Sequence, residues 1–173
     1  MSTPIVPSFD DNTTSGRKLA IICSKGNLDM AYPGLILANA ALGEGIETHL
    51  FFTFWGFDII NKETMADLKF TFVGNTSMHM PGSSMGIHHM LGALPGATAA
   101  STKMMKKMIS DLDVPDVPEF LELLSASGCH MWACRMSADM NKLTEDDLYD
   151  GVEAIISASN FIEITEGAQL LFI

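Results

Sequence analysis

A strand, a helix and a second strand follow one another early in the chain, and this order constrains the fold most. Residues 18–23 (KLAIIC) are an apolar run typical of a strand buried on both faces. Asp29 is expected to cap an alanine-rich helix that runs to about Leu42, with Gly43 beyond its end. Residues 46–53 form the next strand. Because such crossovers are right-handed and join parallel strands, the sequence predicts a parallel sheet with helices packed against it.

The rest of the chain continues this alternation. Helices are expected over residues 102–112, 117–127 and 157–166, and strands over 128–133, 152–156 and 169–173. Thr144 and Asp147 have the spacing of a capping box, which predicts a further helix start. The pattern predicts an α/β fold, a flavodoxin-like three-layer sandwich around a mainly parallel sheet of about five strands. In a flavodoxin-like order the first strand lies beside the third, so Ser24 and Lys25 are expected near Cys134.

The chain of 173 residues is most simply a single domain. Residues 1–16 are polar, without the basic start and apolar core of a leader, and are predicted to be a disordered tail. One α/β domain is expected over residues 17–173. Within it, residues 70–100 are rich in Gly, Ser, Met and His. Loops of this length are uncommon in compact domains, so a functional or oligomer-forming insert with some helix is predicted.

Composition excludes some partners and favours others. The net charge of −11 disfavours binding to phosphate backbones, so no nucleic-acid partner is expected. Three cysteines are too few for a disulfide framework and indicate a reducing compartment, which fits a cytoplasmic protein. A hydrophobic content of 47%, with 13 methionines, is high for a small monomer. Contact with other copies is the simplest explanation, and peripheral membrane contact is the weaker alternative.

Cys134 is the candidate nucleophile. It leaves the expected third strand at its carboxyl end, where ligands bind in open α/β sheets. The cation of Arg135 and the N-terminus of a helix beginning near Ser137 would both favour a thiolate. The alternative is that Cys134 is a small buried hydrophobic residue, as free cysteines commonly are.

The other two cysteines and one tryptophan have less specific contexts. Cys129 and Cys134 are spaced C-x4-C, which along one strand separates them by about 16 Å. A disulfide requires Cα atoms within about 7 Å, so Cys129 is expected to be structural, with a resolving or sulfur-relay role as the alternative. Cys23 is expected to be buried. Trp55 follows the second strand, either as a core residue or as a shield over a substrate.

No cofactor or metal site is predicted. The chain lacks both glycine-rich phosphate-binding patterns, G-x-x-x-x-G-K and G-x-G-x-x-G. Thioether and imidazole groups of the insert are suitable ligands for copper(I): Met78, Met80, Met85, His88, His89 and Met90. Their spacing matches no metal-binding pattern, and methionines also fill irregular cores and interfaces, which is the favoured interpretation.

Taken together, these segments resemble the DsrE/DsrF-like family of sulfur-relay proteins, in particular its longer, methionine-rich branch often labelled "peroxiredoxin-like". The resemblance covers about residues 18–173 and rests on KLAIICSKGNLDMAYPGLILANAALGEG, HLFFTFWGFDIINK, the Gly/Met-rich insert, ACRMSADM, DDLYDGVEAI and LLFI. The family motif Ala-Cys-x-x-Ser falls on residues 133–137, and Ala138 stands where a methionine is expected. No peroxiredoxin signature precedes any of the three cysteines, so peroxidase activity is not expected.

The resemblance implies a homo-oligomeric, cytoplasmic carrier with a flavodoxin-like fold. Its cysteine, Cys134 here, would take sulfane sulfur from thiosulfate, tetrathionate or a persulfide, hold it as a persulfide or S-thiosulfonate, and pass it to a TusA-type carrier. Arg135 and the loop at Ser24-Lys25 are the candidate ligands for the anion. Two alternatives remain open. One is a thiol-disulfide reductase that uses Cys129 or Cys23, and the other is a non-enzymatic scaffold whose Met-rich insert contacts a membrane or a metal.

Overall fold

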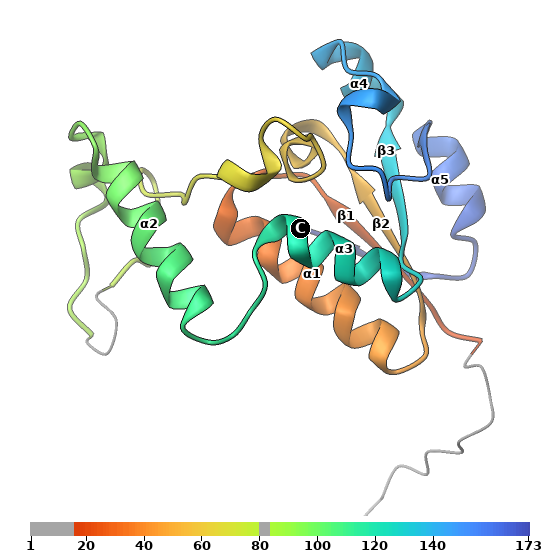
Figure 1. Ribbon diagram of the computed structural model, residues 1–173, viewed down its shortest axis with the longest axis horizontal. Coiled ribbons are helices and arrows are strands. Elements are labelled where there is room, and N and C mark those ends of the chain that lie inside the picture. Colours follow the sequence, from red (N-terminus) through yellow and green to blue (C-terminus); the bar gives the residue numbers. More distant parts are fainter. Residues whose placement is uncertain (1–15, 80–83) are drawn as a thin grey trace, which may run out of the picture.

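The computed structural model describes residues 16–79 and 84–173 (Figure 1). The predicted tail, apart from Gly16, therefore lies outside the described residues, as does Met80 of the insert. The strands are β1 (Lys18–Cys23), β2 (Glu47–Phe52), β3 (His130–Cys134), β4 (Ala154–Ile156) and β5 (Gln169–Phe172). The α-helices are α1 (Leu28–Gly43), α2 (Ala97–Ser110), α3 (Val117–Ala126), α4 (Arg135–Asn141) and α5 (Ala158–Ile164). Short 3-10 turns are η1 (Phe54–Ile59), η2 (Met65–Asp67), η3 (His89–Ala93) and η4 (Glu145–Asp147).

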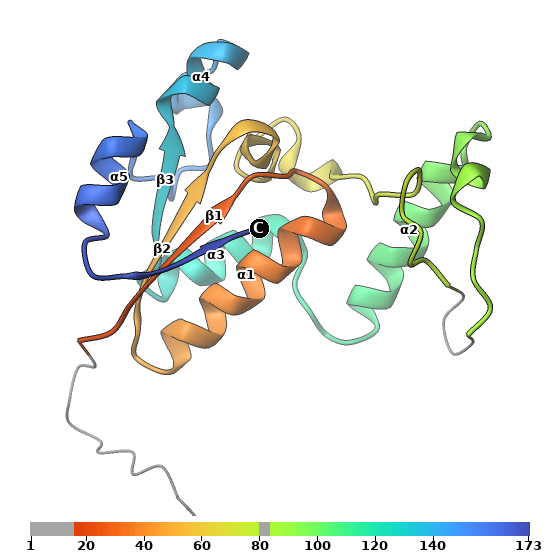
Figure 2. The ribbon, with the colours of Figure 1, turned by 180° about the vertical axis from the view of Figure 1, so that it is seen from behind.

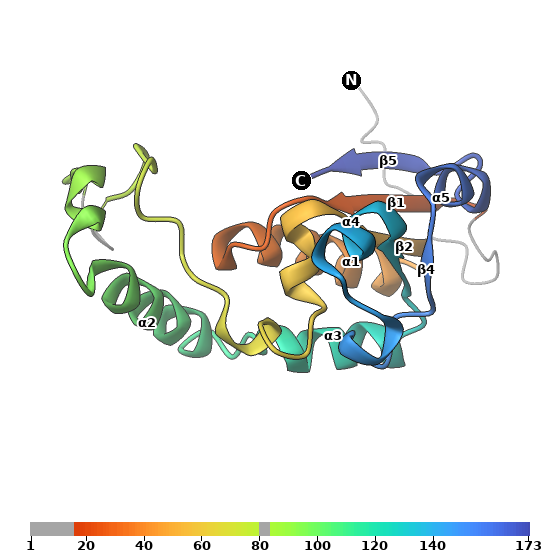
Figure 3. The same ribbon diagram turned by 90° about the horizontal axis from the view of Figure 1, so that it is seen from above.

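The five strands form one sheet in the order β4-β3-β2-β1-β5, and every neighbouring pair is parallel. This confirms the predicted α/β fold around a five-stranded parallel sheet. Helices α1 and α3 lie together on one side of the sheet (Figure 3). Between them and the sheet, residues such as Ile21, Leu50 and Leu121 are fully buried. On the other face α5 packs through Phe161, whose ring stacks on Phe51 of β2 at 4.4 Å between centroids.

The expected parallel pairing of β1 with β2 is confirmed, but the expected pairing of β1 with β3 is wrong, because β3 pairs with β2 and β5 takes the remaining edge of β1. The reason is burial. Five of the six residues of β2 are buried, so that strand requires a neighbour on each side. The residues of β5 are mostly exposed and suit an edge of the sheet. Consequently the loop after β1, with Ser24 and Lys25, is separated from Cys134 by the whole of β2.

Several element boundaries differ from the predictions. Helix α1 has Asn27 at its N-cap position, not Asp29, and Gly43 is its last residue. The carboxylate of Asp29 accepts a hydrogen bond from the backbone N–H of Thr71 at 2.9 Å, so it holds the chain that enters the insert. Helix α2 begins five residues earlier than expected, directly after Gly96, whose φ of +81° is readily adopted by glycine. The predicted capping box at residues 144–147 forms, but it begins only the short turn η4.

The segment of residues 70–112 projects away from the sheet and carries α2 (Figures 1 and 2). Polar contacts order its base and join it to the body of the protein. Within the segment, the backbone N–H of Phe70 donates to the Thr102 hydroxyl at 3.0 Å. The Lys106 ammonium reaches the body and donates to the carbonyl of Ala66 at 2.8 Å. The part of this segment that the structure describes exposes many large apolar side chains: Val73, Met85, Met90, Leu91, Leu94, Met104, Met108 and Leu112.

Candidate functional site

Cys134 lies where a strand becomes a helix. It is the last residue of β3 and the N-cap of α4, with the extended backbone (φ −73°, ψ 122°) that is normal for this position. Its side chain is only 5% exposed, yet it lies in the wall of a cavity of about 610 Å³ that opens between β5, α4 and α5. The sulfur is thus shielded on most sides and reachable from one.

Two hydroxyl groups contact the sulfur. Thr53 follows the last residue of β2, which pairs with β3, and Ser137 lies in the first turn of α4. Their oxygens are 3.3 Å apart, and both side chains hydrogen-bond to Cys134. Ser137 is fully buried, and its hydroxyl accepts the N–H of Phe54 at 2.7 Å, so its own proton is free to point toward Thr53 or the sulfur.

The start of α4 adds backbone donors. The N–H groups of Met136 and Ser137, which are free amides of a helix N-terminus, favour the thiolate and lower the pKa of Cys134. The side chain of Cys134 does not form a cap hydrogen bond with either of them. All these donors are neutral groups fixed by the fold, so a thiolate at Cys134 is solvated by the protein instead of by water.

The surroundings shift the pKa values of the three thiols in different directions. Burial opposes ionisation of Cys134, but the hydrogen bonds from Thr53, Ser137 and Met136 outweigh it and lower the pKa of Cys134 below its usual value of 9.0. Burial, followed by the proximity of Cys129, raises the pKa of Cys23 to about 12. Burial, followed by the Glu153 carboxylate, raises the pKa of Cys129 to about 12 as well. Of the three thiols, Cys134 is therefore the one that ionises most readily and the best candidate nucleophile.

The cavity beside Cys134 has a mainly apolar wall. Ile22 and Phe51 form its inner part, and Phe54, Met136 and Phe172 lie at its mouth. These last three are 46%, 57% and 71% exposed, which is unusual for large apolar side chains. An incoming molecule would therefore meet an apolar rim before it reached the sulfur.

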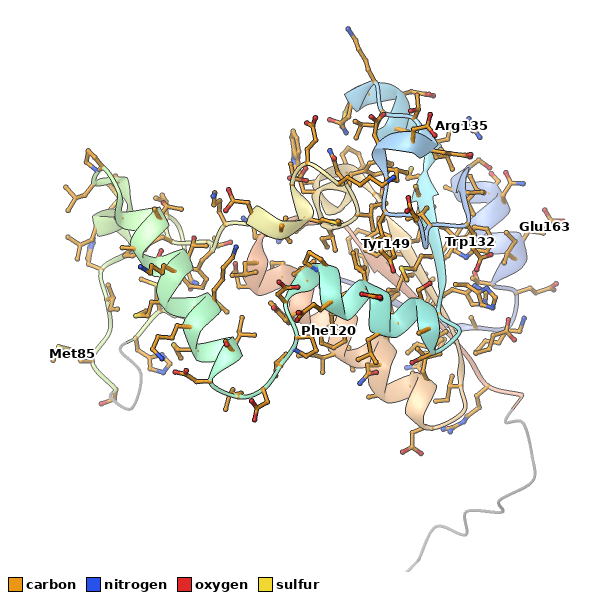
Figure 4. The ribbon with its side chains drawn as sticks, in the orientation of Figure 1. Met85, Phe120, Trp132, Arg135, Tyr149 and Glu163 are labelled. Atoms are coloured by element: carbon orange, nitrogen blue, oxygen red, sulfur yellow. The ribbon has the colours of Figure 1, made fainter. Side chains whose placement is uncertain are left out.

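Arg135 is in this cavity wall, as its position after Cys134 suggested. Figure 4 shows it beside α4 at the end of β3, with Trp132 lower on the same strand. Its Nη2 donates to the carbonyl of Ile155 in β4 at 2.6 Å. It contributes nothing resolved to the pKa of Cys134, whose stabilising contacts are all neutral groups. The sequence correctly placed Arg135 near the thiol, but the contacts that favour the thiolate come from other residues.

Ser24, Lys25 and Trp55 are not brought to this cavity. The Ser24 hydroxyl donates to the carbonyl of Ile173 at 2.8 Å, beyond the end of β5. Trp55 is 63% exposed and therefore is not a core residue. It lines a separate cavity of about 390 Å³ beside Asp58 and η2. Ser24 and Lys25 follow β1, and β2 separates them from Cys134. Trp55 follows β2, the neighbour of β3, but its side chain lines the other cavity.

The second thiol considered from the sequence is also remote. Cys129 precedes β3 and so lies at the opposite end of that strand from Cys134. Its Sγ–H donates to the carbonyl of Thr48 at 3.6 Å, which accounts for a structural role. Cys23 faces α1, because a Cβ placed on Gly34 of that helix would be 2.9 Å from its sulfur. Cys134 opens instead toward α5, on the other face of the sheet.

The Met-rich segment forms an apolar cavity of about 400 Å³, with Met78 and His79 on one side and Met104, Met105 and Met108 of α2 on the other. The side chains of His88 and His89 stack on one another at 5.1 Å between ring centroids. Within residues 16–79 and 84–173, no three His, Cys, Asp or Glu side chains converge as the ligands of a metal would. None of the described helices is long and apolar enough to span a bilayer.

Known proteins resemble this chain over most of its length. A model of the DsrE/DsrF/DrsH-like family matches residues 15–172. The sulfur carrier protein DsrE2 of Allochromatium vinosum is 37% identical over 158 residues, which cover 91% of this chain and 98% of the relative. The uncharacterized protein YrkE of Bacillus subtilis is 29% identical over 164 residues, 93% of this chain and 99% of the relative. A solved structure, protein MTH1491 of unknown function from Methanobacterium thermoautotrophicum, shares the fold with a TM-score of 0.55, at 10% identity and coverage of 91% and 99%.

Proposed function

The chain belongs to the DsrE/DsrF/DrsH-like family, and we propose that it is a sulfur carrier that loads sulfane sulfur on Cys134. The family resemblance seen in the sequence is thereby confirmed, and the 37% identical sulfur carrier protein supports a role in sulfur relay. The single observation that carries the proposal is the contrast between thiols. Hydrogen bonds lower the pKa of Cys134, whereas burial raises the pKa of Cys23 and Cys129 to about 12.

The chemistry requires one thiolate and two exchanges. The Cys134 thiolate attacks the outer sulfur of a donor, a sulfur–sulfur bond forms, and the remainder of the donor leaves with the electron pair of the broken bond. In the second exchange, the thiolate of a partner attacks the sulfur held on Cys134 and restores the original thiolate. Thr53 and Ser137 hydrogen-bond to the sulfur of Cys134. The same groups would therefore stabilise this thiolate both as the nucleophile of the first exchange and as the leaving group of the second.

The acceptor is proposed to be a TusA-type sulfur carrier, as the family resemblance implies, and its thiol must reach Cys134 from outside. The open cavity and the exposed side chains of Phe54, Met136 and Phe172 support access by a protein surface. Homo-oligomeric assembly and a cytoplasmic location stay predictions, which light scattering and cell fractionation would test.

A thiol-disulfide reductase is the alternative that the geometry supports less. Its cycle needs a second thiol close to Cys134, but Cys129 is at the far end of β3 and Cys23 faces α1. Both are buried, and their raised pKa values keep them protonated at neutral pH. A disulfide to either residue would require the sheet to be opened.

The deciding experiment is intact-protein mass spectrometry after incubation with a sulfur donor. Wild type and the Cys129→Ser variant are expected to gain about 32 Da for a persulfide or about 112 Da for an S-thiosulfonate, reversibly with thiols. Cys134→Ser is expected to gain neither. Serine preserves the donor to Thr48 at position 129, which makes that variant a matched control. Loading of Cys134→Ser, or a loss of two hydrogens from wild type on oxidation, would contradict the assignment.

A further inference from the structure

We infer that Cys134 accepts a single sulfur atom from a persulfide and discriminates against dianionic donors such as tetrathionate and thiosulfate. The inference rests on the proposed function and narrows it to one class of donor. Its basis is the set of charged side chains around the cavity. The sequence had suggested that Lys25 is one of them, and the structure places Lys25 elsewhere.

The groups that hold the sulfur are suited to one small anion. The Thr53 and Ser137 hydroxyls and the N–H groups at the start of α4 converge on Sγ itself. A persulfide extends this position by one sulfur–sulfur bond of about 2 Å, so its outer atom remains close to the same donors. An S-thiosulfonate instead adds a sulfonate beyond the sulfur, with three oxygens that each need a hydrogen-bond donor.

The wall beyond the sulfur offers such oxygens little. Ile22, Phe51 and Phe172 line it, and the hydroxyl of Ser157 is engaged with the side chain of Asn160. A sulfonate there would lose water without gaining comparable partners, which is costly for a charged group. A persulfide sulfur is more polarisable and less strongly hydrated, and it tolerates an apolar wall.

The cavity also has no net positive charge. Of the described residues that line it, Arg135 is the only cation and Asp139, one helical turn later, is the only anion. The guanidinium donates to the carbonyl of Ile155, and it also lines a neighbouring cavity whose wall contains Asp139, Glu145 and Asp146. Carboxylates therefore line both cavities to which Arg135 contributes.

The charge of the whole chain acts in the same direction. A net charge of −11 lowers the local concentration of a dianion more than that of a neutral donor. Lys25, which the sequence suggested as a ligand for the anion, is separated from Cys134 by β2. Long-range electrostatics therefore oppose tetrathionate and thiosulfate, and the charges that line the cavity do not offset this repulsion.

The favoured step is balanced without a further oxidant. The Cys134 thiolate attacks the outer sulfur of R–S–SH, the Cys134 sulfur–sulfur bond forms, and the R–S bond to that sulfur breaks. The bond that breaks is the donor's own sulfur–sulfur bond, so R–S⁻ leaves with its electron pair and its carbon–sulfur bond intact, and the proton stays on the transferred sulfur or passes to R–S⁻. The sulfane sulfur moves from one thiol to another, so the pair of reactants undergoes no net oxidation.

The test compares loading rates by intact-protein mass spectrometry. Cysteamine persulfide, whose ammonium offsets its anion, and tetrathionate are each reacted with the full chain and, as the reference thiol, with N-acetylcysteine. The ratio of the tetrathionate rate to the persulfide rate is expected to be about tenfold lower for Cys134 than for the reference. Normalising to a free thiol removes the intrinsic difference in reactivity between the two donors.

A charge-reversal variant tests whether electrostatic repulsion causes the discrimination between donors. Asp139 is exposed, so Asp139→Lys should fold, and it is expected to raise the tetrathionate rate about fivefold while changing the persulfide rate less. Glu44→Lys makes the same change beyond the far end of α1, more than a Debye length of about 8 Å away, and should leave the ratio unaltered.

The outcomes separate the two proposals. Equal normalised rates for both donors, with loading confined to Cys134, would refute the discrimination and leave the sulfur-carrier function standing. An unchanged ratio in Asp139→Lys would refute the electrostatic cause and with it the inference. If neither donor loaded wild type, the sulfur-carrier function itself would fail. The expected pattern is preference for the persulfide, relieved only by the substitution at Asp139.

Discussion

The hydroxyl of Thr53 is predicted to set the acidity of Cys134, and Thr53→Val tests this with almost no change of shape. Thr53 is 8% exposed, and its Oγ1 lies 3.3 Å from the Ser137 hydroxyl and hydrogen-bonds to Cys134. Ser137→Ala is a less specific probe. It would also leave the Phe54 N–H, now paired at 2.7 Å, without its acceptor, at a cost of about 1–3 kcal/mol.

The size of the effect follows from the hydrogen bond that is lost. A hydrogen bond to a charged group contributes about 1.5–3 kcal/mol, and 1.36 kcal/mol corresponds to about one pKa unit. In Thr53→Val the hydroxyl of Ser137 is released from Thr53 and can turn fully toward the sulfur, which offsets part of the loss. We therefore expect the pKa of Cys134 to rise by about one unit, the lower end of that range.

The assay is the rate of alkylation by iodoacetamide as a function of pH, followed by mass spectrometry. Cys23 and Cys129 do not interfere, since their pKa values of about 12 keep them protonated across the titration. Well below the pKa the thiolate population falls about tenfold in Thr53→Val. The higher basicity partly compensates, so the observed rate should fall about three- to fourfold.

The matched control is Thr48→Val. Thr48 lies near the start of β2, the strand that Thr53 follows, and therefore at the end remote from Cys134. It is fully buried, and its hydroxyl donates to the carbonyl of Ile46 at 2.9 Å. It is expected to leave the titration of Cys134 unchanged. If Thr53→Val left the pKa where it was while circular dichroism showed an intact fold, the hydrogen-bonded thiolate would be the wrong explanation for this site.

Two further predictions concern the scaffold. A Cβ on Gly56 would overlap the carbonyl oxygen of Cys23, so Gly56→Ala should displace η1 and lower the free energy of unfolding by about 2 kcal/mol or more in urea titrations. Burial lowers the pKa of His49 from 6.5 despite its bond to Glu47, and the Trp132 N–H at 3.2 Å requires Nδ1 to be unprotonated. At pH values below 6.5 the unfolded chain therefore binds a proton at His49 more readily than the folded chain does, so the free energy of unfolding should fall as the pH drops. In His49→Asn this fall should be less steep. A flat profile in wild type, or an unaltered stability in Gly56→Ala, would contradict these predictions.

The local part of the site was predictable from the sequence. The apolar run that ends at Cys134 and the polar residues after it indicate a strand that leaves the sheet and a helix that begins, and both form. The N–H donors of Met136 and Ser137 follow from this, because the first turn of any helix has unpaired amides. Helix boundaries were less accurate, since tertiary contacts such as that of Asp29 with Thr71 determine them.

The non-local part was not predictable from local pattern. Thr53 and Phe54 reach Cys134 only because β2 lies beside β3, and strand order depends on how the whole set of strands is buried. One signal was present: the consecutive apolar residues LFF (50–52) are typical of a central strand that is buried on both faces. Giving β2 that place would have directed attention to Thr53 and away from Ser24 and Lys25.

This arrangement determines what kind of thiol chemistry the fold can support. The chain has three cysteines, and the sheet separates the acidic one from the two that burial keeps protonated. A site with a single usable thiol cannot complete a disulfide cycle within one chain, so whatever Cys134 accepts must leave to a thiol of another molecule. That thiol has to approach through the cavity mouth, past Phe54, Met136 and Phe172. We therefore propose that these exposed apolar side chains, which are unfavourable in an isolated chain, form the binding site of a sulfur acceptor.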